Sequence, residues 1–259
     1  MGSLMTWSLL VVVPARNEEQ LIGRCVESVQ SAIAATAQGL RSTRLVIVAD
    51  RCDDRTVAVA RRTAADASKH SNGHDHRTVI VSTSATSVGD ARATGAESGR
   101  ELLSGTHPET IWLANTDADT VVPATWIDDQ LRWATAGFHA VAGTVDVDTF
   151  TDYPPGHAQR FHRHYTALLP AGDDDHSHVH AANMGIRLDA YLSVGGWAKL
   201  PRSEDRDLWM RLVAGGYRTR SPASLRVLTS GRKHNRIENG FADSLVALLP
   251  DESESTSAA

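Results

Sequence analysis

The sequence predicts a single α/β domain built on a mostly parallel, doubly wound sheet with helices on both faces. Short β-branched runs alternate with segments of helical periodicity through the first half of the chain, and each such run ends in a cluster of polar residues. The 259 residues contain no internal repeat and no linker between two apolar cores. Repeated strand–helix units form parallel sheets, whose ligands bind beyond the carboxyl ends of the strands.

The first two strand–helix units have the strongest patterns. Residues 8–13 (SLLVVV) form a run typical of a strand that is buried on both faces. A polar cap and early acids at 17–19 predict the start of a helix, whose apolar residues continue at helical spacing to Ile33. Residues 44–49 (RLVIVA) are the second expected strand, which breaks at 50–54 before the second helix.

Two further strands complete the regular half of the chain. Residues 78–81 are expected to form the third strand, after a polar surface loop at 69–76. The small-residue-rich segment 89–103 is expected to be helical, and residues 110–114 (TIWLA) are the fourth expected strand. The carboxyl ends of all four strands are therefore expected at one edge of the sheet.

The second half is less regular. A strand is expected at 140–146, and the segment 153–180, rich in His, Asp, Pro and Gly, is expected to be a long mobile loop. The remaining expected elements are helices at 187–194, 204–214 and 240–249 and a short strand at 226–228. The acidic tail at 251–259 has the composition of a disordered segment.

Composition and charge exclude several classes of protein. The formal net charge is −5, whereas a nucleic-acid binder normally shows a basic patch or stripe. No run approaches the ~20 apolar residues that span a bilayer, and the first residues lack the pattern of a signal peptide. The two cysteines, Cys25 and Cys52, form no disulfide framework. We expect a cytoplasmic protein with reduced thiols and no integral membrane segment, for which a homodimer is a possible assembly.

Two carboxylates, Asp117 and Asp119, follow the fourth expected strand. In an extended segment, residues two apart point the same way, so both carboxylates would face one ion. Hard divalent cations prefer oxygen ligands and often bridge a carboxylate and substrate phosphates. The structural alternative is an ordinary surface turn, in which aspartate is common.

Acidic residues also end the second strand and open a late helix. Asp50 lies where a carboxylate can accept from a ribose hydroxyl or a base N–H, while Asp53 or Asp54 is expected to cap the following helix. Glu204 and Asp205 open an amphipathic helix, whose dipole stabilises ionised acids. Two interpretations are open. The acids only stabilise the start of the helix, or one of them also acts as a general base toward an acceptor hydroxyl.

Isolated basic and imidazole groups complete the set of candidate residues. Arg92, near the start of the third helix, is placed to reach a diphosphate, and His234, in the basic loop 231–236, is placed to complete a metal site. The alternating histidines of 176–180 (HSHVH) would share one face of a strand, where three imidazoles can hold Zn²⁺. Their surroundings are instead typical of a loop, which argues against a dedicated zinc site.

Taken in order, these pieces resemble glycosyltransferase family 2, the inverting transferases of the GT-A fold, from about residue 8 to about residue 234. Residues 13–18 (VPARNE) resemble the family's VPxxNE turn, and 48–56 its VDDGSxDxT turn. The remaining similar segments are 89–95 (GDARATG, against GxxxARNxG), 117–119 (the DxD motif), 181–185 with 194–197 (the stretch beside the donor sugar), 204–205 (the ED pair) and His234. Each motif is weak alone, but their order and spacing are specific.

The resemblance implies roles for individual residues. Mg²⁺ or Mn²⁺ would be held by Asp119 with Asp117 and His234, and Asp205, beside Glu204, would be the catalytic base. The residues implied in binding the nucleotide-sugar donor are Pro14, Ala15, Arg16, Asn17, Glu18, Asp50, Arg92, Asp117 and Asn183.

The resemblance also implies an organisation and a class of reaction. Residues 5–250 would form one GT-A domain, with a nucleotide-binding half at about 5–120 and an acceptor-binding half at about 121–250. A hexosyl group would pass from the donor to a small-molecule or lipid acceptor, while the segment 153–180 closes over the donor. The QxxRW motif of processive members is absent from the sequence, which favours a single transfer.

Three alternatives remain at this stage. Residues 117–121 (DADTV) also fit the DxDxT start of haloacid-dehalogenase-like phosphatases, although no matching downstream Lys and paired-Asp motifs are present. A nucleotidyltransferase would open with a Gly-rich loop, whereas residues 13–18 contain no glycine. A non-catalytic sugar-nucleotide binding protein would not need the Glu204–Asp205 pair.

Overall fold

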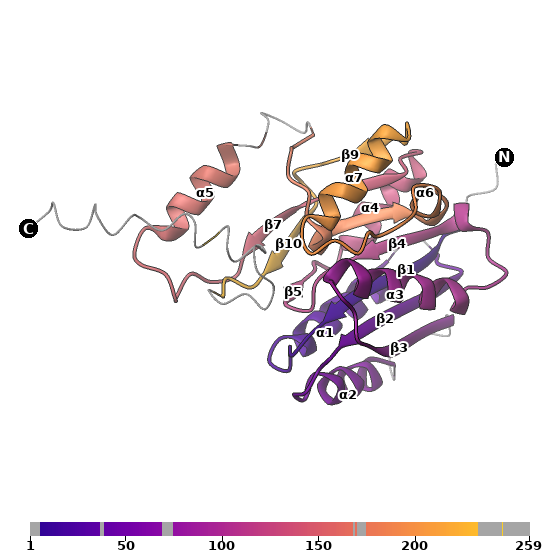
Figure 1. The fold of residues 1–259 in the computed structure, drawn as a ribbon, viewed down its shortest axis with the longest axis horizontal. Helices are drawn as coiled ribbons and strands as arrows, with labels where there is room; N and C mark the ends of the chain where they lie inside the picture. Colours follow the sequence, from indigo (N-terminus) through magenta and orange to yellow (C-terminus); the bar gives the residue numbers. More distant parts are fainter. Residues whose placement is uncertain are drawn as a thin grey trace, which may run out of the picture.

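The computed structural model describes residues 6–36, 39–68, 75–167, 169, 175–232 and 245. Within these residues, a seven-stranded mixed sheet has the order β3-β2-β1-β4-β8-β6-β9, and a three-stranded sheet has the order β5-β10-β7 (Figure 1). The strands are β1 (Ser8–Ala15), β2 (Ser42–Asp50), β3 (Asp75–Thr83), β4 (Ile111–Asn115), β5 (Thr120–Val121), β6 (Ala140–Ala142), β7 (Thr144–Val147), β8 (Met184–Arg187), β9 (Thr219–Arg220) and β10 (Arg226–Thr229).

Helices cover both faces of the larger sheet. They are α1 (Ile22–Ala35), α2 (Thr56–Ser68), α3 (Val88–Leu102), α4 (Trp126–Thr135), α5 (His157–Ala167), α6 (Leu188–Ser193) and α7 (Glu204–Ala214), with the 3₁₀ turns η1 (Pro108–Thr110) and η2 (Ala181–Asn183). In the part of the chain that the structure describes, none of these helices has the length and apolar character needed to cross a membrane.

Strand pairing confirms the predicted mostly parallel, doubly wound sheet. β1 pairs in parallel with both β2 and β4, and β2 pairs in parallel with β3. The exception is β8, which runs antiparallel between β4 and β6. The carboxyl ends of β1, β2 and β4 therefore meet at one edge, as the sequence predicted.

The central strand β1 is buried along its whole length because its side chains alternate between two cores. Leu9 and Val11 pack into the core that contains residues of α1 and α4. Leu10 and Val12 pack into the opposite core, with residues of α3, α6 and α7. A strand buried on both faces needs apolar residues at every position, which is the pattern read from 8–13.

A glycine lets α3 lie close to the sheet. A Cβ added at Gly95 would lie 2.6 Å from Val12 Cγ1 and 2.7 Å from Val48 Cγ2, so a larger residue would push the helix outward. This close approach holds the first turn of α3, which carries Arg92, over the carboxyl end of the sheet.

The first helix begins later than predicted. Asn17 adopts a left-handed backbone with φ 54°, and the Glu18 carbonyl oxygen accepts from the amides of Leu21 and Ile22. α1 therefore begins at Ile22, and the polar residues at 17–19 form a turn before it. The predicted cap of the second helix is confirmed, because Asp54 Oδ1 accepts from the Thr56 amide at 2.8 Å.

The strand predicted at 140–146 is in fact two strands in different sheets. β6 belongs to the large sheet, whereas β7 pairs with β10 in the small one. The chain changes sheet at Gly143, where an added Cβ would collide with the Asn183 side chain and the Leu225 carbonyl.

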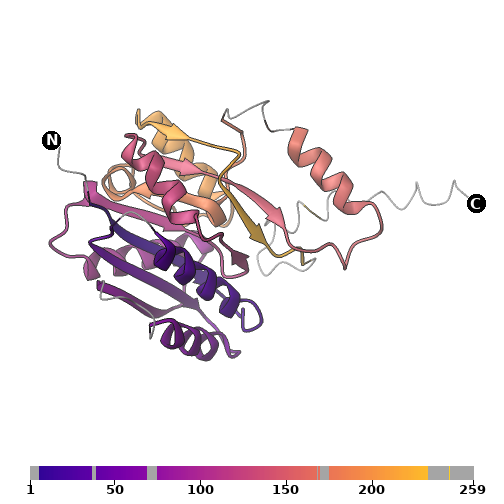
Figure 2. The ribbon, with the colours of Figure 1, turned by 180° about the vertical axis from the view of Figure 1, so that it is seen from behind.

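The segment predicted as a long loop at 153–180 contains a helix, α5, which stands away from the body of the sheet in both views (Figures 1 and 2). Its buried residues, His157, Phe161 and Tyr165, follow one another at intervals of four and so share one face. The polar composition of this helix concealed its single apolar stripe. The helix predicted at 240–249, the tail at 251–259 and most of the loop at 69–76 lie outside the described residues, apart from Leu245.

Candidate active site

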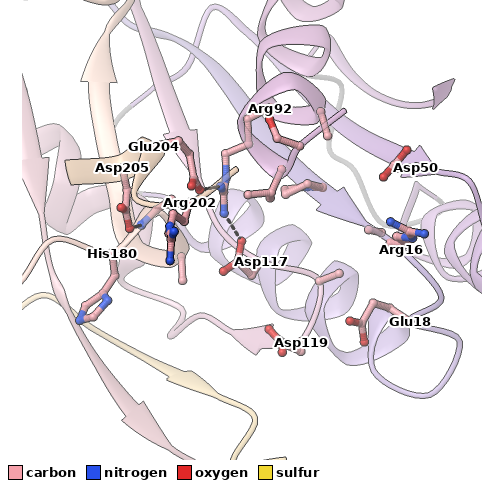
Figure 3. A pocket seen from close by; sticks show the side chains of 18 of the residues that line it. Arg16, Glu18, Asp50, Arg92, Asp117, Asp119, His180, Arg202, Glu204 and Asp205 are labelled. Carbon is pink, nitrogen blue, oxygen red and sulfur yellow. Dashed lines mark hydrogen bonds and ion pairs between the residues drawn. The ribbon is translucent and has the colours of Figure 1, made fainter. Parts of the chain in front are cut away.

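A pocket with a volume of about 500 Å³ opens at the carboxyl ends of β1, β2 and β4 (Figure 3). Segments from both halves of the chain line it, which is the position expected for a ligand of a doubly wound sheet. Its charged and imidazole lining residues are Arg16, Glu18, Asp50, Arg51, Arg92, Asp117, Asp119, His180, Arg202, Glu204, Asp205 and Arg232.

Asp50 occupies one end of the pocket. Its Oδ1 accepts from the Ala85 amide at 2.9 Å, and the neighbouring Arg51 guanidinium donates to both carboxylate oxygens at 3.0 Å. Both partners hold the Asp50 carboxylate in place at the end of β2.

Of the residues at 14–18 that were predicted to bind the donor, Pro14, Ala15, Arg16 and Glu18 line the pocket and Asn17 does not. The Asn17 Oδ1 instead accepts from the Asp53 amide at 3.0 Å. Asn17 therefore joins the turn after β1 to the turn after β2, and its predicted contact with the donor stays a prediction.

Left-handed backbone is concentrated at this pocket. Among the described residues, the non-glycine positions with positive φ are Asn17 (54°), Arg51 (46°) and Ser203 (56°). Arg51 and Ser203 line the pocket, and Asn17 lies between two residues that do. Such conformations are costly and are concentrated at binding and catalytic sites.

The segment that carries Asp117 and Asp119 is a turn and not the extended segment from which the sequence argument started. The Thr120 amide donates to the Asp117 carbonyl at 3.0 Å, and β4 has already ended at Asn115. The buried Cys25 thiol supports the turn from below by donating to the same carbonyl at 3.2 Å. The two carboxylates consequently face two different arginines.

Arg92 forms ion pairs with Asp117 on one side and with α7 on the other. Its Nη2 donates to Asp117 Oδ1 and its Nη1 to Glu204 Oε1, each at 2.5 Å, and the guanidinium lies 5.3 Å from the Trp197 ring centroid. The side chain is only 3% exposed. Both terminal nitrogens of Arg92 thus hold carboxylates, and the predicted contact of this pocket-lining residue with a diphosphate stays a prediction.

Arg232 faces the other carboxylate. Its guanidinium donates to both oxygens of Glu18, at 2.7 and 2.8 Å, and its Nη2 lies 2.8 Å from Asp119 Oδ2. Burial, and after it the nearby charge of Asp117, raises the pKa of Asp119 to about 6. Sequence reasoning missed Arg232, because nothing within the basic loop 231–236 distinguished it from its neighbours.

Glu204 and Asp205 open α7 and have different environments. The Glu204 carboxylate is buried against Arg92. The Asp205 carboxylate accepts backbone amides from Arg206 at 2.7 Å and Ala181 at 3.3 Å. Burial, followed by the charge of Glu204, raises the pKa of Asp205. Both carboxylates line the pocket, and Asp205 is the one that no described ion pair holds.

Asn183, predicted to bind the donor, is fully buried and does not line the pocket. Its Nδ2 donates to the Thr144 and Leu225 carbonyls, and its Oδ1 accepts from Trp126 Nε1, all at 2.9 Å. The amide therefore satisfies buried groups where the two sheets meet, and its predicted contact with the donor stays a prediction.

The DxD carboxylates fit a divalent cation that also binds substrate phosphates. Asp117 and Asp119 both line the pocket and supply hard oxygen ligands. No three His, Cys, Asp or Glu side chains in the described ranges form a ready-made set of metal ligands. One or two carboxylates plus phosphate oxygens are, however, the usual protein share of a Mg²⁺ site. His234 lies outside the described residues.

The histidines at 176–180 do not form the zinc site considered above. The His178 ring stacks on Tyr165 with centroids 3.9 Å apart, and the His180 Nε2 lies 3.2 Å from the Tyr165 hydroxyl. These imidazoles pack against an aromatic ring of α5, and His180 alone of the alternating three lines the pocket.

Solved structures of similar fold are glycosyltransferases. The mannosyltransferase PcManGT from Pyrobaculum calidifontis, solved in complex with GDP-Man and Mn²⁺, is 17% identical over 89% of this chain and 59% of that one, with a TM-score of 0.66. TarS 1–349 from S. aureus, solved in complex with UDP-GlcNAc, is 12% identical over 90% of this chain and 61% of that one, with a TM-score of 0.60. The chain thus spans about three fifths of each, and at these identities the similarity shows the fold.

The family is shown by the sequence itself. A comparison with curated proteins found no match. The family model described as "Glycosyl transferase family 2" matches residues 10–195, which include both the DxD turn and the loops after β1 and β2. This match confirms the resemblance read from the motifs and gives no support to the phosphatase and nucleotidyltransferase alternatives. The chain belongs to glycosyl transferase family 2.

Proposed function

We propose that the protein is an inverting, non-processive glycosyltransferase that moves a sugar from a nucleotide-diphosphate donor to an acceptor hydroxyl. The observation that carries the proposal is the convergence of Asp50, the DxD carboxylates and Asp205 on one pocket. Figure 3 shows them spread along it, with Asp50 at one end, Asp117 and Asp119 in the middle and Asp205 at the other end.

This order supports an assignment of substrate parts to the pocket. The nucleoside lies over the ends of β1 and β2, where Asp50 accepts from its base or ribose. The diphosphate then lies beside Asp117 and Asp119, and the sugar lies toward Asp205. Arg92 is a positioning residue, because it ties the turn that carries Asp117 to the helix that carries Asp205.

Asp119 and Asp117 would hold Mg²⁺ or Mn²⁺, with the predicted His234 as a further ligand. The ion, when bound, neutralises the charge that develops on the departing diphosphate. The proposed metal dependence rests on the carboxylates of the turn and their fit to oxygen-bound cations.

The transfer is a single displacement at the anomeric carbon. The acceptor oxygen bonds to that carbon while its bond to the diphosphate oxygen breaks, and the bonding electron pair leaves with the nucleoside diphosphate. Asp205 takes the hydroxyl proton, a role favoured by its raised pKa. Backbone amides of Ala181 and Arg206 hold the carboxylate in place. Attack on the face opposite the leaving group inverts the configuration.

Thermal unfolding with a panel of nucleoside diphosphates and nucleotide sugars, with and without Mn²⁺, tests the proposal. Ligands that bind the native state raise its apparent stability by mass action. We expect a metal-dependent rise in Tm with one nucleoside diphosphate, and its loss in Asp119→Ala. No rise with any nucleotide at concentrations well above typical affinities would refute the proposal.

A further inference from the structure

Most cationic side chains that line the pocket already hold carboxylates. Arg51 pairs with Asp50, and Arg92 pairs with Asp117 and Glu204. Arg232 pairs with Glu18 and Asp119. These pairs account for the acids at the nucleoside end and in the middle of the pocket, and leave Asp205 held by backbone amides.

Arg202 differs from these arginines. It lines the pocket, yet no ion pair or hydrogen bond joins its guanidinium to any of the residues that the structure describes. Figure 3 shows it at the Asp205 end of the pocket, far from Asp50 and Arg16. A guanidinium offers a planar fork of donors that matches a carboxylate or a phosphate.

The backbone fixes Arg202 at this position relative to the proposed base. Pro201 precedes it, and Ser203 turns the chain through a left-handed conformation (φ 56°) into α7. Glu204, the next residue, is tied down by the buried Arg92. Arg202 and Asp205 therefore flank the segment Ser203–Glu204, which is held in place, and both line the same end of the pocket.

His180, the other basic group at this end, supplies no charge. Burial lowers its pKa to about 3, so the imidazole is neutral at physiological pH. In the proposed function, the donor diphosphate lies beside Asp117 and Asp119, in the middle of the pocket, and its charge is met by the metal ion that they would hold. Arg202 is thus available for an anion on the substrate part that reaches the Asp205 end.

We propose that the acceptor carries a carboxylate or phosphate group close to its reacting hydroxyl, and that Arg202 binds this group while Asp205 receives the hydroxyl proton. This inference rests on the proposed function, because it takes the Asp205 end as the acceptor side. The anionic group and the reacting hydroxyl would belong to the same part of the acceptor, because Arg202 and Asp205 lie at the same end of the pocket.

The test uses the full chain saturated with its nucleoside diphosphate and Mn²⁺, so that the donor phosphate positions are filled. Inorganic phosphate, D-glycerate and glycerol are titrated by calorimetry into the wild type, Arg202→Gln and Arg206→Gln. Arg206 is a matched control, because it is an exposed arginine of the same segment that does not line the pocket. We expect an anion to bind and glycerol not to bind, with affinity at least about tenfold weaker in Arg202→Gln and unchanged in Arg206→Gln.

Two results would overturn the inference while the proposed function stands. Either no anion binds the loaded wild type, or the anion binds Arg202→Gln as tightly as the wild type. Weaker nucleoside diphosphate binding in Arg202→Gln, with the anion unaffected, would place Arg202 on the donor instead. Absence of nucleoside diphosphate binding to the wild type would refute the proposed function itself and the inference with it.

Discussion

The Arg232 guanidinium lies 2.8 Å from the Asp119 carboxylate, on which the proposed metal site depends. The same guanidinium also holds Glu18 through two hydrogen bonds. An internal cation therefore balances the carboxylate that is proposed to bind a metal ion, and we expect the two cations to compete for it.

Arg232→Gln is expected to bind Mn²⁺ about tenfold more tightly than the wild type in the absence of nucleotide. Removal of a competing positive charge beside Asp119 favours a divalent cation by Coulomb attraction. Electron paramagnetic resonance of free Mn²⁺ measures this affinity directly. Arg202→Gln is the control, because Arg202 has no described ion pair with Asp119. Weaker or unchanged Mn²⁺ binding in Arg232→Gln would show that the two cations do not compete.

Arg92→Gln is expected to lower the free energy of unfolding by about 3–5 kcal/mol. Loss of one partner from a buried ion pair leaves the remaining carboxylates, here Glu204 and Asp117, without compensation. Urea unfolding followed by circular dichroism gives the value. Arg100→Gln removes a solvent-exposed arginine from the same helix, where it pairs with Glu97, and should leave stability unchanged. Equal effects of the two substitutions would contradict the structural role of Arg92.

Asn183→Ala separates a structural role from donor binding. The side-chain amide satisfies two buried carbonyls and an indole N–H, and a buried group left unsatisfied costs about 1–3 kcal/mol. We expect reduced stability in urea and an unchanged affinity for the nucleoside diphosphate in calorimetry at a temperature where the variant is folded. Lost nucleotide affinity at full stability would restore the role predicted from the sequence.

Acid should destabilise the fold through two histidines. Burial lowers the pKa of His176 to about 4 and of His180 to about 3, from ordinary values near 6.5. Above pH 6.5 both are neutral in either state and have no effect on stability. As the pH falls below 6.5, the unfolded state takes up protons first, so each imidazole lowers stability by on the order of 1 kcal/mol per pH unit until its folded pKa is reached.

Urea unfolding between pH 7 and pH 5 measures this dependence. His180→Gln should flatten it, whereas substitution of the exposed His164 on α5 should leave it unchanged. An identical pH dependence in the wild type and His180→Gln would mean that His180 titrates alike in the folded and unfolded states.

The regular half of the fold could be predicted because its signals are local. A strand buried on both faces must be apolar throughout, as β1 is after Ser8. In the less regular second half, the amphipathic pattern at 204–214 also predicted α7 with the bounds that the structure shows. Gly143 gave no such signal, because the change of sheet there depends on Asn183 and Leu225, distant in sequence. α5 was missed because polar and imidazole side chains occupy most of its positions, and its one buried face has only three residues, His157, Phe161 and Tyr165.

The sequence indicated which acidic residues belong to the candidate site, but it did not indicate which basic residues pair with them. The sequence places Asp50, Asp117 and Asp205 at the ends of elements, and topology alone brings such ends together. Which cation each acid meets depends on residues far away in the chain. Arg92 is 112 positions from Glu204, and Arg232 is 214 positions from Glu18, so neither pair had a sequence signal.

The proposed role of Asp205 as the base of a nucleotide-sugar site can be measured directly. The measurement is release of nucleoside diphosphate from the donor that the thermal panel identifies, with water as the nucleophile, in the wild type and Asp205→Asn. We expect a rate at least about 10²-fold lower in the variant, with nucleoside diphosphate affinity retained, because a positioned base is lost while the binding groups remain. Wild-type turnover in Asp205→Asn would contradict it.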